Sequence, residues 1–179
     1  MNGPRLTFPN YEWSDAYDRY FNTAAVKASG LDADHPRAAV LSTRDDIMTM
    51  TQQAHDAALT PKKPGGLSHG ERAALSCRMA RLNEEAPLAA HFEAMIGDSN
   101  ATQIADLAFD GGDDERLCAL LRHTDLATTD TKSVVAADIA ALVSAGVSED
   151  DIVRLSELVA FVNYQVRLTI GLRLMGDAS

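Results

Sequence analysis

Apolar residues recur every three or four positions along most of this chain, and that spacing predicts helices. In the segment 150–175 the apolar positions keep this spacing and no proline interrupts them, which predicts one long helix. The period-two runs of valine, isoleucine and tyrosine that are typical of strands are not found in the sequence. The pattern therefore predicts an all-α fold in which helices pack on helices.

Boundary residues place several of these helices. Ser68 and Glu71 have the spacing of a capping box, in which each side chain binds an unpaired backbone amide at a helix start. Ser133 is expected to cap a helix that ends at Gly146, where glycine tolerates the left-handed conformation, and Ser148 is expected to begin the last helix. Further helices are expected at 44–59, 87–96, 102–109 and 113–122.

Proline and glycine divide the chain into two parts. The segment 60–66 contains two prolines and two glycines and is the strongest candidate linker. Residues 1–60 are expected to form a helical extension packed on a core of residues 67–176, the whole being one structural domain. Aromatic residues recur at helical spacing in the extension, where they would cover the chain's own core or a neighbouring subunit: Trp13, Tyr17, Tyr20 and Phe21.

Composition narrows the classes of function. The chain has 16 basic and 26 acidic residues in 179, a formal net charge of −10, which argues against binding to nucleic acid or to an anionic membrane. No apolar run reaches the length of a membrane span, and the first residues do not resemble a signal peptide, so a cytoplasmic location is expected. No histidine, cysteine and carboxylate spacing resembles a metal site, and no glycine-rich phosphate loop follows a strand. Neither a metal nor a cofactor is expected.

Two groups of residues match a known pattern in their order and spacing. The first comprises LSHGER (67–72), RMARLN (78–83) and His91, and the second comprises DIAAL (138–142), GVS (146–148), VAFVN (159–163) and Arg167. Over roughly residues 67–174 the chain resembles the alkylhydroperoxidase D-like and carboxymuconolactone decarboxylase family. The resemblance implies an all-helical bundle of the alkylhydroperoxidase D-like type that assembles into oligomers.

The redox motif of that family is missing from the segment that resembles it. In the family a Cys-x-x-Cys pair and a histidine follow the Leu-Asn step, which stands here at 82–83. Aligned on that step, the two cysteine positions fall on Glu85 and Leu88, and the histidine falls on Phe92, beside His91. A peroxidatic thiol needs a second thiol to resolve its sulfenic acid, so the pattern favours a thiol-independent relative.

His91 is the candidate base of such a relative. The acidic position of the family falls on Ala73, with Glu71 two residues earlier, and Glu85 lies six residues before His91. The expectation is acid–base chemistry in which His91 is the base and Glu85 or Glu71 its partner. The residues expected to complete the pocket are Leu88, Phe92, Asn163 and Arg167. Glu85 and His91 also fit a solvated helix end, and Asn163 and Arg167 also fit a subunit interface or plain surface.

Three functions stay open at this point. The first is an enzyme, for which the resemblance implies peroxidase (oxidoreductase) or decarboxylase-type activity. The second is a non-catalytic subunit of a homo-oligomer, or a partner of a relative that carries the Cys-x-x-Cys pair. The third is a residual peroxidase that uses Cys77 or Cys118, and the missing resolving thiol disfavours it. For the other histidines a surface or capping role is expected: His55, His69 and His123.

The length of the last helix and its two apolar faces predict self-association. Beside the stripe that begins at Ile152, a second set of apolar residues follows the same helix: Leu158, Phe161, Tyr164, Leu168 and Leu172. Two such faces exceed what one small bundle needs to cover its core. A homo-oligomer is therefore expected, with the aromatic N-terminal segment and the last helix contributing to the contact.

Overall fold

A computed structural model describes residues 20–97 and 100–177. Within these residues regular structure is helical throughout and no strand is formed, so the predicted all-α fold is confirmed. The α-helices are α2 (Ala24–Ser29), α3 (Ala38–Leu41), α4 (Asp45–Leu59), α5 (His69–Leu82), α6 (Ala86–Ile96), α7 (Glu115–Thr129), α8 (Ala136–Ser144) and α9 (Glu149–Asp177). Short 3-10 turns cover Ser42–Arg44, Asn100–Ala105 and Thr131–Ser133.

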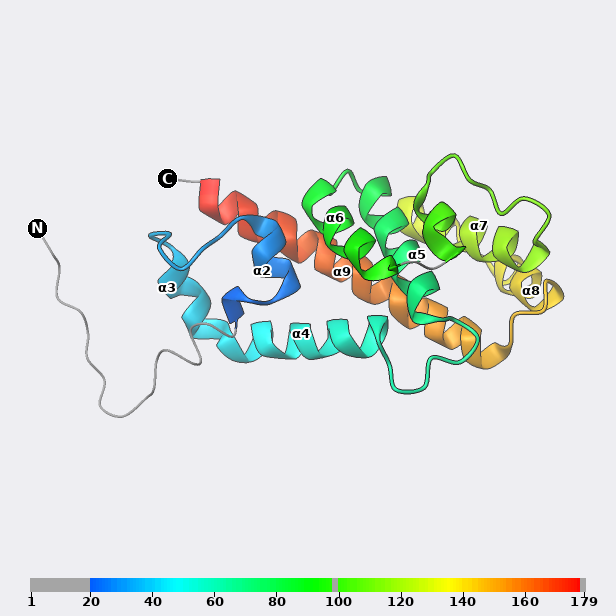
Figure 1. Ribbon diagram of the computed structural model, residues 1–179, viewed down its shortest axis with the longest axis horizontal. Coiled ribbons are helices and arrows are strands. Elements are labelled where there is room, and N and C mark those ends of the chain that lie inside the picture. The colour runs from blue at the N-terminus through cyan, green and yellow to red at the C-terminus, as the bar shows by residue number, and fades with distance from the viewer. Residues whose placement is uncertain (1–19, 98–99, 178–179) are drawn as a thin grey trace, which may run out of the picture.

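The last helix, α9, crosses the whole molecule and organises the other helices (Figure 1). The N-terminal helices α2 and α4 pack on it, and so do α5, α7 and α8. The extension predicted for 1–60 thus contacts the core through α2 and α4. Although α9 has 29 residues, it carries charged side chains along its length, and no helix in the described part of the chain has both the length and the apolar character of a membrane span.

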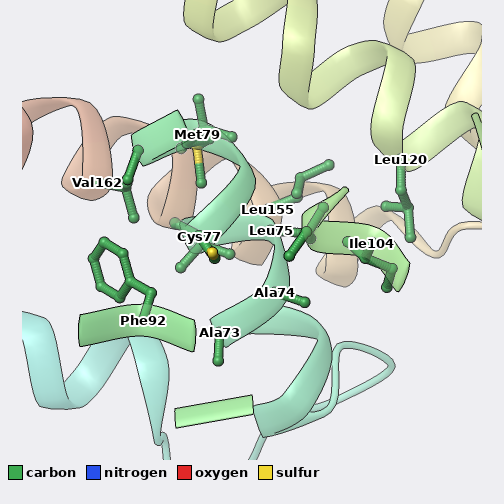
Figure 2. Packing of buried hydrophobic residues seen from close by; sticks show 14 of the residues in the cluster. Ala73, Ala74, Leu75, Cys77, Met79, Phe92, Ile104, Leu120, Leu155 and Val162 are labelled. Atoms are coloured by element: carbon green, nitrogen blue, oxygen red, sulfur yellow. The ribbon is translucent and has the colours of Figure 1, made fainter. Parts of the chain in front are cut away.

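The helix α5 is the centre of the core. Its nine consecutive residues 72–80 are all buried, which is more than the single apolar stripe of a surface helix would bury. Small side chains make this possible, because Ala73, Ala74 and Ala80 let neighbouring helices approach from every side. Figure 2 shows Leu75 and Cys77 of this helix among apolar residues of several other elements.

Two arginines of α5 are buried and bind backbone carbonyls. Arg72 donates to the carbonyls of Leu67, Ala58 and Pro64 at 2.9–3.0 Å, and these bonds fasten the linker 60–66 to the core. Arg78 donates to the Asp125 carboxylate at 2.6 and 2.7 Å. It also donates to three carbonyls of the segment after α6: Ile104, Asp106 and Phe109. Both guanidinium groups therefore replace their lost hydration with fixed acceptors.

The second apolar face of α9 is covered in part by the chain itself, and Tyr164 on that face is 44% exposed. Leu158 is fully buried in the main core, and Leu172 joins a smaller cluster formed with Tyr20 of the N-terminal segment. Tyr20 is only 2% exposed, whereas Trp13 and Tyr17 lie outside the described residues. Part of the apolar surface that predicted a subunit contact on α9 is thus occupied by the chain's own helices.

Three helix boundaries differ from the sequence prediction. The expected helix 102–109 is a 3-10 turn over Asn100–Ala105, and α7 continues to Thr129 rather than ending near 122. Ser133 does not cap α8, because it belongs to a separate turn. The helix instead begins at Ala136, where the Asp138 carboxylate accepts the Val135 amide at 2.9 Å. The capping box of Ser68 and Glu71 and the start of α9 after Ser148 are confirmed.

Replacing Arg78 by methionine should destabilise the fold by about 3–5 kcal/mol, because three carbonyls and the Asp125 carboxylate would lose their donor together. Urea denaturation followed by circular dichroism measures this change in the free energy of unfolding. The control is Arg122→Met, whose side chain is 76% exposed and lies 3.7 Å from Asp138. The free energy of unfolding of this variant should stay within about 0.5 kcal/mol of the parent's. Equal losses of stability in both variants would contradict the role given to Arg78.

Candidate functional site

The predicted base, His91, is paired with a second histidine. His91 lies in the second turn of α6, and its Nε2 is 3.0 Å from Nε2 of His55 on α4. His55 is 3% exposed and His91 is half-buried. One of the two facing nitrogens must carry the proton that joins them, so the protonation states of the two rings are coupled.

The other ring nitrogen of His55 has polar neighbours. Its Nδ1 lies 3.1 Å from Oδ1 of Asp56 and 3.3 Å from Nε2 of Gln52. Gln52 also donates to Asp56 at 2.8 Å and accepts the amide of Ala24 at 2.9 Å, which holds this group in place. The shorter contact is with a carboxylate and favours a proton on Nδ1 of His55. Its Nε2 then accepts from His91, and Nδ1 of His91 is the basic nitrogen of the pair.

Aromatic rings surround the histidine pair. Phe92 is stacked on His55 with ring centroids 6.1 Å apart, and Phe161 meets the same ring edge-on at 6.2 Å. Burial lowers the pKa of His91, and the nearby His55 and Lys27 lower it further by charge repulsion. His91 is therefore neutral at neutral pH, the state in which an imidazole can accept a proton.

The two glutamates expected to assist His91 are bound to arginines. Glu85 follows the left-handed residue Glu84 (φ 57°) and precedes the first residue of α6. It is 2% exposed, and Arg173 of α9 donates to both of its carboxylate oxygens. One oxygen of Glu71 accepts the Ser68 amide and the other accepts Arg116 at 2.8 Å. Both carboxylates thus hold the structure together, and His55 takes the place predicted for them beside His91.

The four expected pocket residues fall into two groups. Leu88 and Phe92 are fully buried in the core, where Phe92 contacts the histidine pair and Leu88 fills space. Asn163 and Arg167 line a cavity of about 590 Å³ between α7 and α9. The structure therefore brings Phe92 together with His91, and it places Asn163 and Arg167 in a cavity that neither His55 nor His91 lines.

His55 is the residue that the sequence reading missed. It was expected at the surface or at a helix end, yet it lies on the buried face of α4 with Met48, Thr51 and Leu59. The spacing of these four positions, at three, four and four, was the available signal, because a histidine on an apolar stripe is turned toward the core. Its partner is 36 positions away in sequence, and no local pattern connects the two.

The two cysteines are separate and differ in environment. Cys77 is fully buried in α5, and burial raises the pKa of its thiol, which suppresses the reactive thiolate. Cys118 is partly exposed on α7, and its thiol donates to the Gly112 carbonyl at 3.4 Å. The geometry of Cys77 is that of a small buried hydrophobe rather than of a peroxidatic thiol.

Within the described part of the chain, no three histidines, cysteines or carboxylates are grouped as metal ligands. Comparisons with protein-family models, curated proteins and solved structures give no match to this chain.

His91 should titrate with a midpoint below about 6.5, the usual value for histidine, because its burial and its neighbour both oppose the charged form. Proton NMR of the imidazole resonances against pH measures it. In His55→Gln the midpoint should rise, since the repulsion from a second imidazolium is lost. His69→Gln, an exposed residue that binds the Pro61 carbonyl, is the matched control. A parent midpoint at or above 6.5 would contradict the prediction.

Proposed function

We propose that this chain is an alkylhydroperoxidase D-like helical protein that carries out proton transfer without thiols, with His91 as the base. The observation that carries the proposal is the 3.0 Å contact between Nε2 of His91 and Nε2 of His55. A histidine that is neutral, apolar in its surroundings and joined to a second proton carrier has the properties of a general base. The motifs at 67–72 and 78–83 and the all-helical fold support the family part of the proposal.

The roles of the neighbouring residues follow from the contacts. His55 orients His91 and exchanges a proton with it through the shared Nε2 contact, and Asp56 stabilises the positive charge when the pair is protonated. Phe92 and Phe161 exclude water around His55, which strengthens these electrostatic interactions. Glu85 and Glu71 hold α6 and α5 in place through Arg173 and Arg116.

A peroxidase role receives less support from the same contacts. Peroxide reduction requires a thiolate and a resolving thiol, and Glu85 and Leu88 occupy the positions where the resemblance would place them. The raised pKa and full burial of Cys77 oppose its use as the nucleophile. Acid–base chemistry is therefore the function that the site supports best.

General-base activity can be tested with 5-nitrobenzisoxazole, from which a base removes a carbon-bound proton as the N–O bond breaks and a coloured phenolate forms. The parent chain should accelerate this reaction, and His91→Gln should lower the rate by about 10²-fold or more. His55→Gln should lower it less, because it removes the neighbour but leaves the base. Absorbance of the phenolate measures the rate.

Two controls make that test specific. His69→Gln removes an exposed histidine of α5 and should leave the rate unchanged, as should Cys77→Ser. If His91→Gln and His69→Gln react as fast as the parent, the assignment of His91 as the base is wrong.

A second candidate function, that of a homo-oligomeric subunit, is favoured by the surface of α8. Of this nine-residue helix, whose sequence is largely apolar, Leu142 alone is buried. The side chains that follow one another at spacings of four are exposed by 58%, 36% and 50%: Val135, Ile139 and Val143. Such a stripe is typical of a helix that packs on another chain, and it carries no charge to oppose a second copy of an acidic protein. The proposed contact is therefore on α8, although Val153, Tyr164 and Leu174 of α9 are exposed as well.

The chain should form a homo-oligomer that dissociates when lysines replace Ile139 and Val143 together, because two charges would then be buried in the contact. Light scattering coupled to size exclusion measures the mass, which is 19.2 kDa for one chain. Met50→Lys is the matched control, since Met50 is 52% exposed on α4 and should leave the mass unchanged. A parent mass near 19.2 kDa at micromolar concentration would exclude self-association there.

A further inference from the structure

The cavity between α7 and α9 is separate from the histidine pair. Its volume is about 590 Å³, and neither His55 nor His91 lines it. The volume is in the range of small-molecule sites, which combine apolar walls with a few polar groups. Its apolar wall is formed by Ala127, Val134, Val159 and Ala160, and its polar groups are His123, Thr131, Ser156, Asn163 and Arg167.

The charge of the lining is unusual for this chain. Arg167 is its one arginine or lysine, and no aspartate or glutamate lines the cavity, although the protein has a formal net charge of −10. Arg167 donates one N–H to the carbonyl of Asn163 at 2.9 Å, and no ion pair among the described residues includes it. Arg167 is exposed at this open cavity, and a guanidinium without a carboxylate partner is available as a binding group for an anion.

Asn163 holds this part of the wall in place. Its Nδ2 donates to the Val159 carbonyl at 3.0 Å, and its Oδ1 accepts Nδ2 of Asn83 at 3.4 Å. The backbone carbonyl of the same residue binds Arg167. The guanidinium is therefore anchored to a residue that two further hydrogen bonds fix, which lowers the entropy lost when a ligand binds.

His123 forms a further polar part of the wall. It is 7% exposed, and its Nδ1 is buried with no hydrogen-bond partner among the described residues. A buried polar group without a partner is costly, and this nitrogen lies behind the surface of the cavity rather than on it. His123 also lines a second cavity of about 510 Å³, together with other residues of α7 and α8.

We propose that the cavity between α7 and α9 binds a small monocarboxylic acid, with the carboxylate on Arg167 and an apolar body against Val159, Ala160 and Ala127. One guanidinium balances one negative charge, which favours a carboxylate over a doubly charged phosphate. The site uses neither the base nor the proton carrier of the proposed function, so the two proposals stand or fall separately.

The test uses 3-phenylpropionate as the probe and 3-phenylpropionamide, its uncharged counterpart, as the comparison. Amide chemical shifts of the isotope-labelled full chain report both the affinity and the residues affected. The acid should bind at millimolar concentration or below and shift residues of α7 and α9, and the amide should bind at least about tenfold more weakly.

Variants separate the charge from the cavity. Arg167→Gln should lower the affinity for the acid about tenfold or more, to that of the amide. The matched control is Arg44→Gln, at an exposed residue distant in sequence, and it should change the affinity of neither probe. Ala160→Phe should fill the cavity and remove binding of both probes without touching the charge. Each variant should give the same circular dichroism spectrum as the parent, which shows that it is folded. No binding of the acid, equal binding of acid and amide, or shifts centred on His91 would each overturn the proposal.

Discussion

A helix that is buried on every side must satisfy its polar side chains within the protein, and α5 does so with two arginines. Arg72 binds three carbonyls around the linker, and Arg78 binds three carbonyls and a carboxylate around the segment after α6. Because each guanidinium has five donors in a fixed plane, it can fix several irregular segments at once. The positions of the loops on both sides of the core therefore depend on α5 and its two buried charges.

The histidine pair joins parts of the chain that the sequence presents as separate. His55 belongs to α4, in the extension before the linker, and His91 belongs to α6, in the core after it. Packing of α4 on α9 and fastening of the linker by Arg72 bring the two helices to the distance at which the rings meet. The candidate site is thus a product of the complete fold, and the extension contributes to its chemistry.

Local signals in the sequence predicted much of the fold. Short-range features are found where they were expected: the capping box at Ser68, the helix start after Ser148 and the long run of apolar positions in α9. The complete burial of α5 was not predicted, because it depends on which helices surround it. Small residues such as Ala73 and Ala80 permit close packing without specifying the neighbours.

The candidate site was less predictable for the same reason. His91 could be singled out from its place in a motif, whereas its contact with His55 depends on two helices that are far apart in sequence. Glu71 was expected from its place near the family's acidic position and Glu85 from its place six residues before His91, and the structure pairs them with arginines from α7 and α9. Asn163 and Arg167 were expected in a pocket and do line one, but the fold places that cavity beside His123.

The ion pair between Glu85 and Arg173 also restricts which substitutions this chain can tolerate at position 85. A cysteine at position 85 would remove the carboxylate partner of a half-buried guanidinium on α9 and leave it the Ala28 carbonyl alone, so the single substitution would lose stability before a second thiol could make the first one useful. A route to a thiol pair at 85 and 88 would have to pass through a prior or simultaneous change at Arg173. Arg173 on the last helix thereby disfavours replacement of Glu85 at the start of α6.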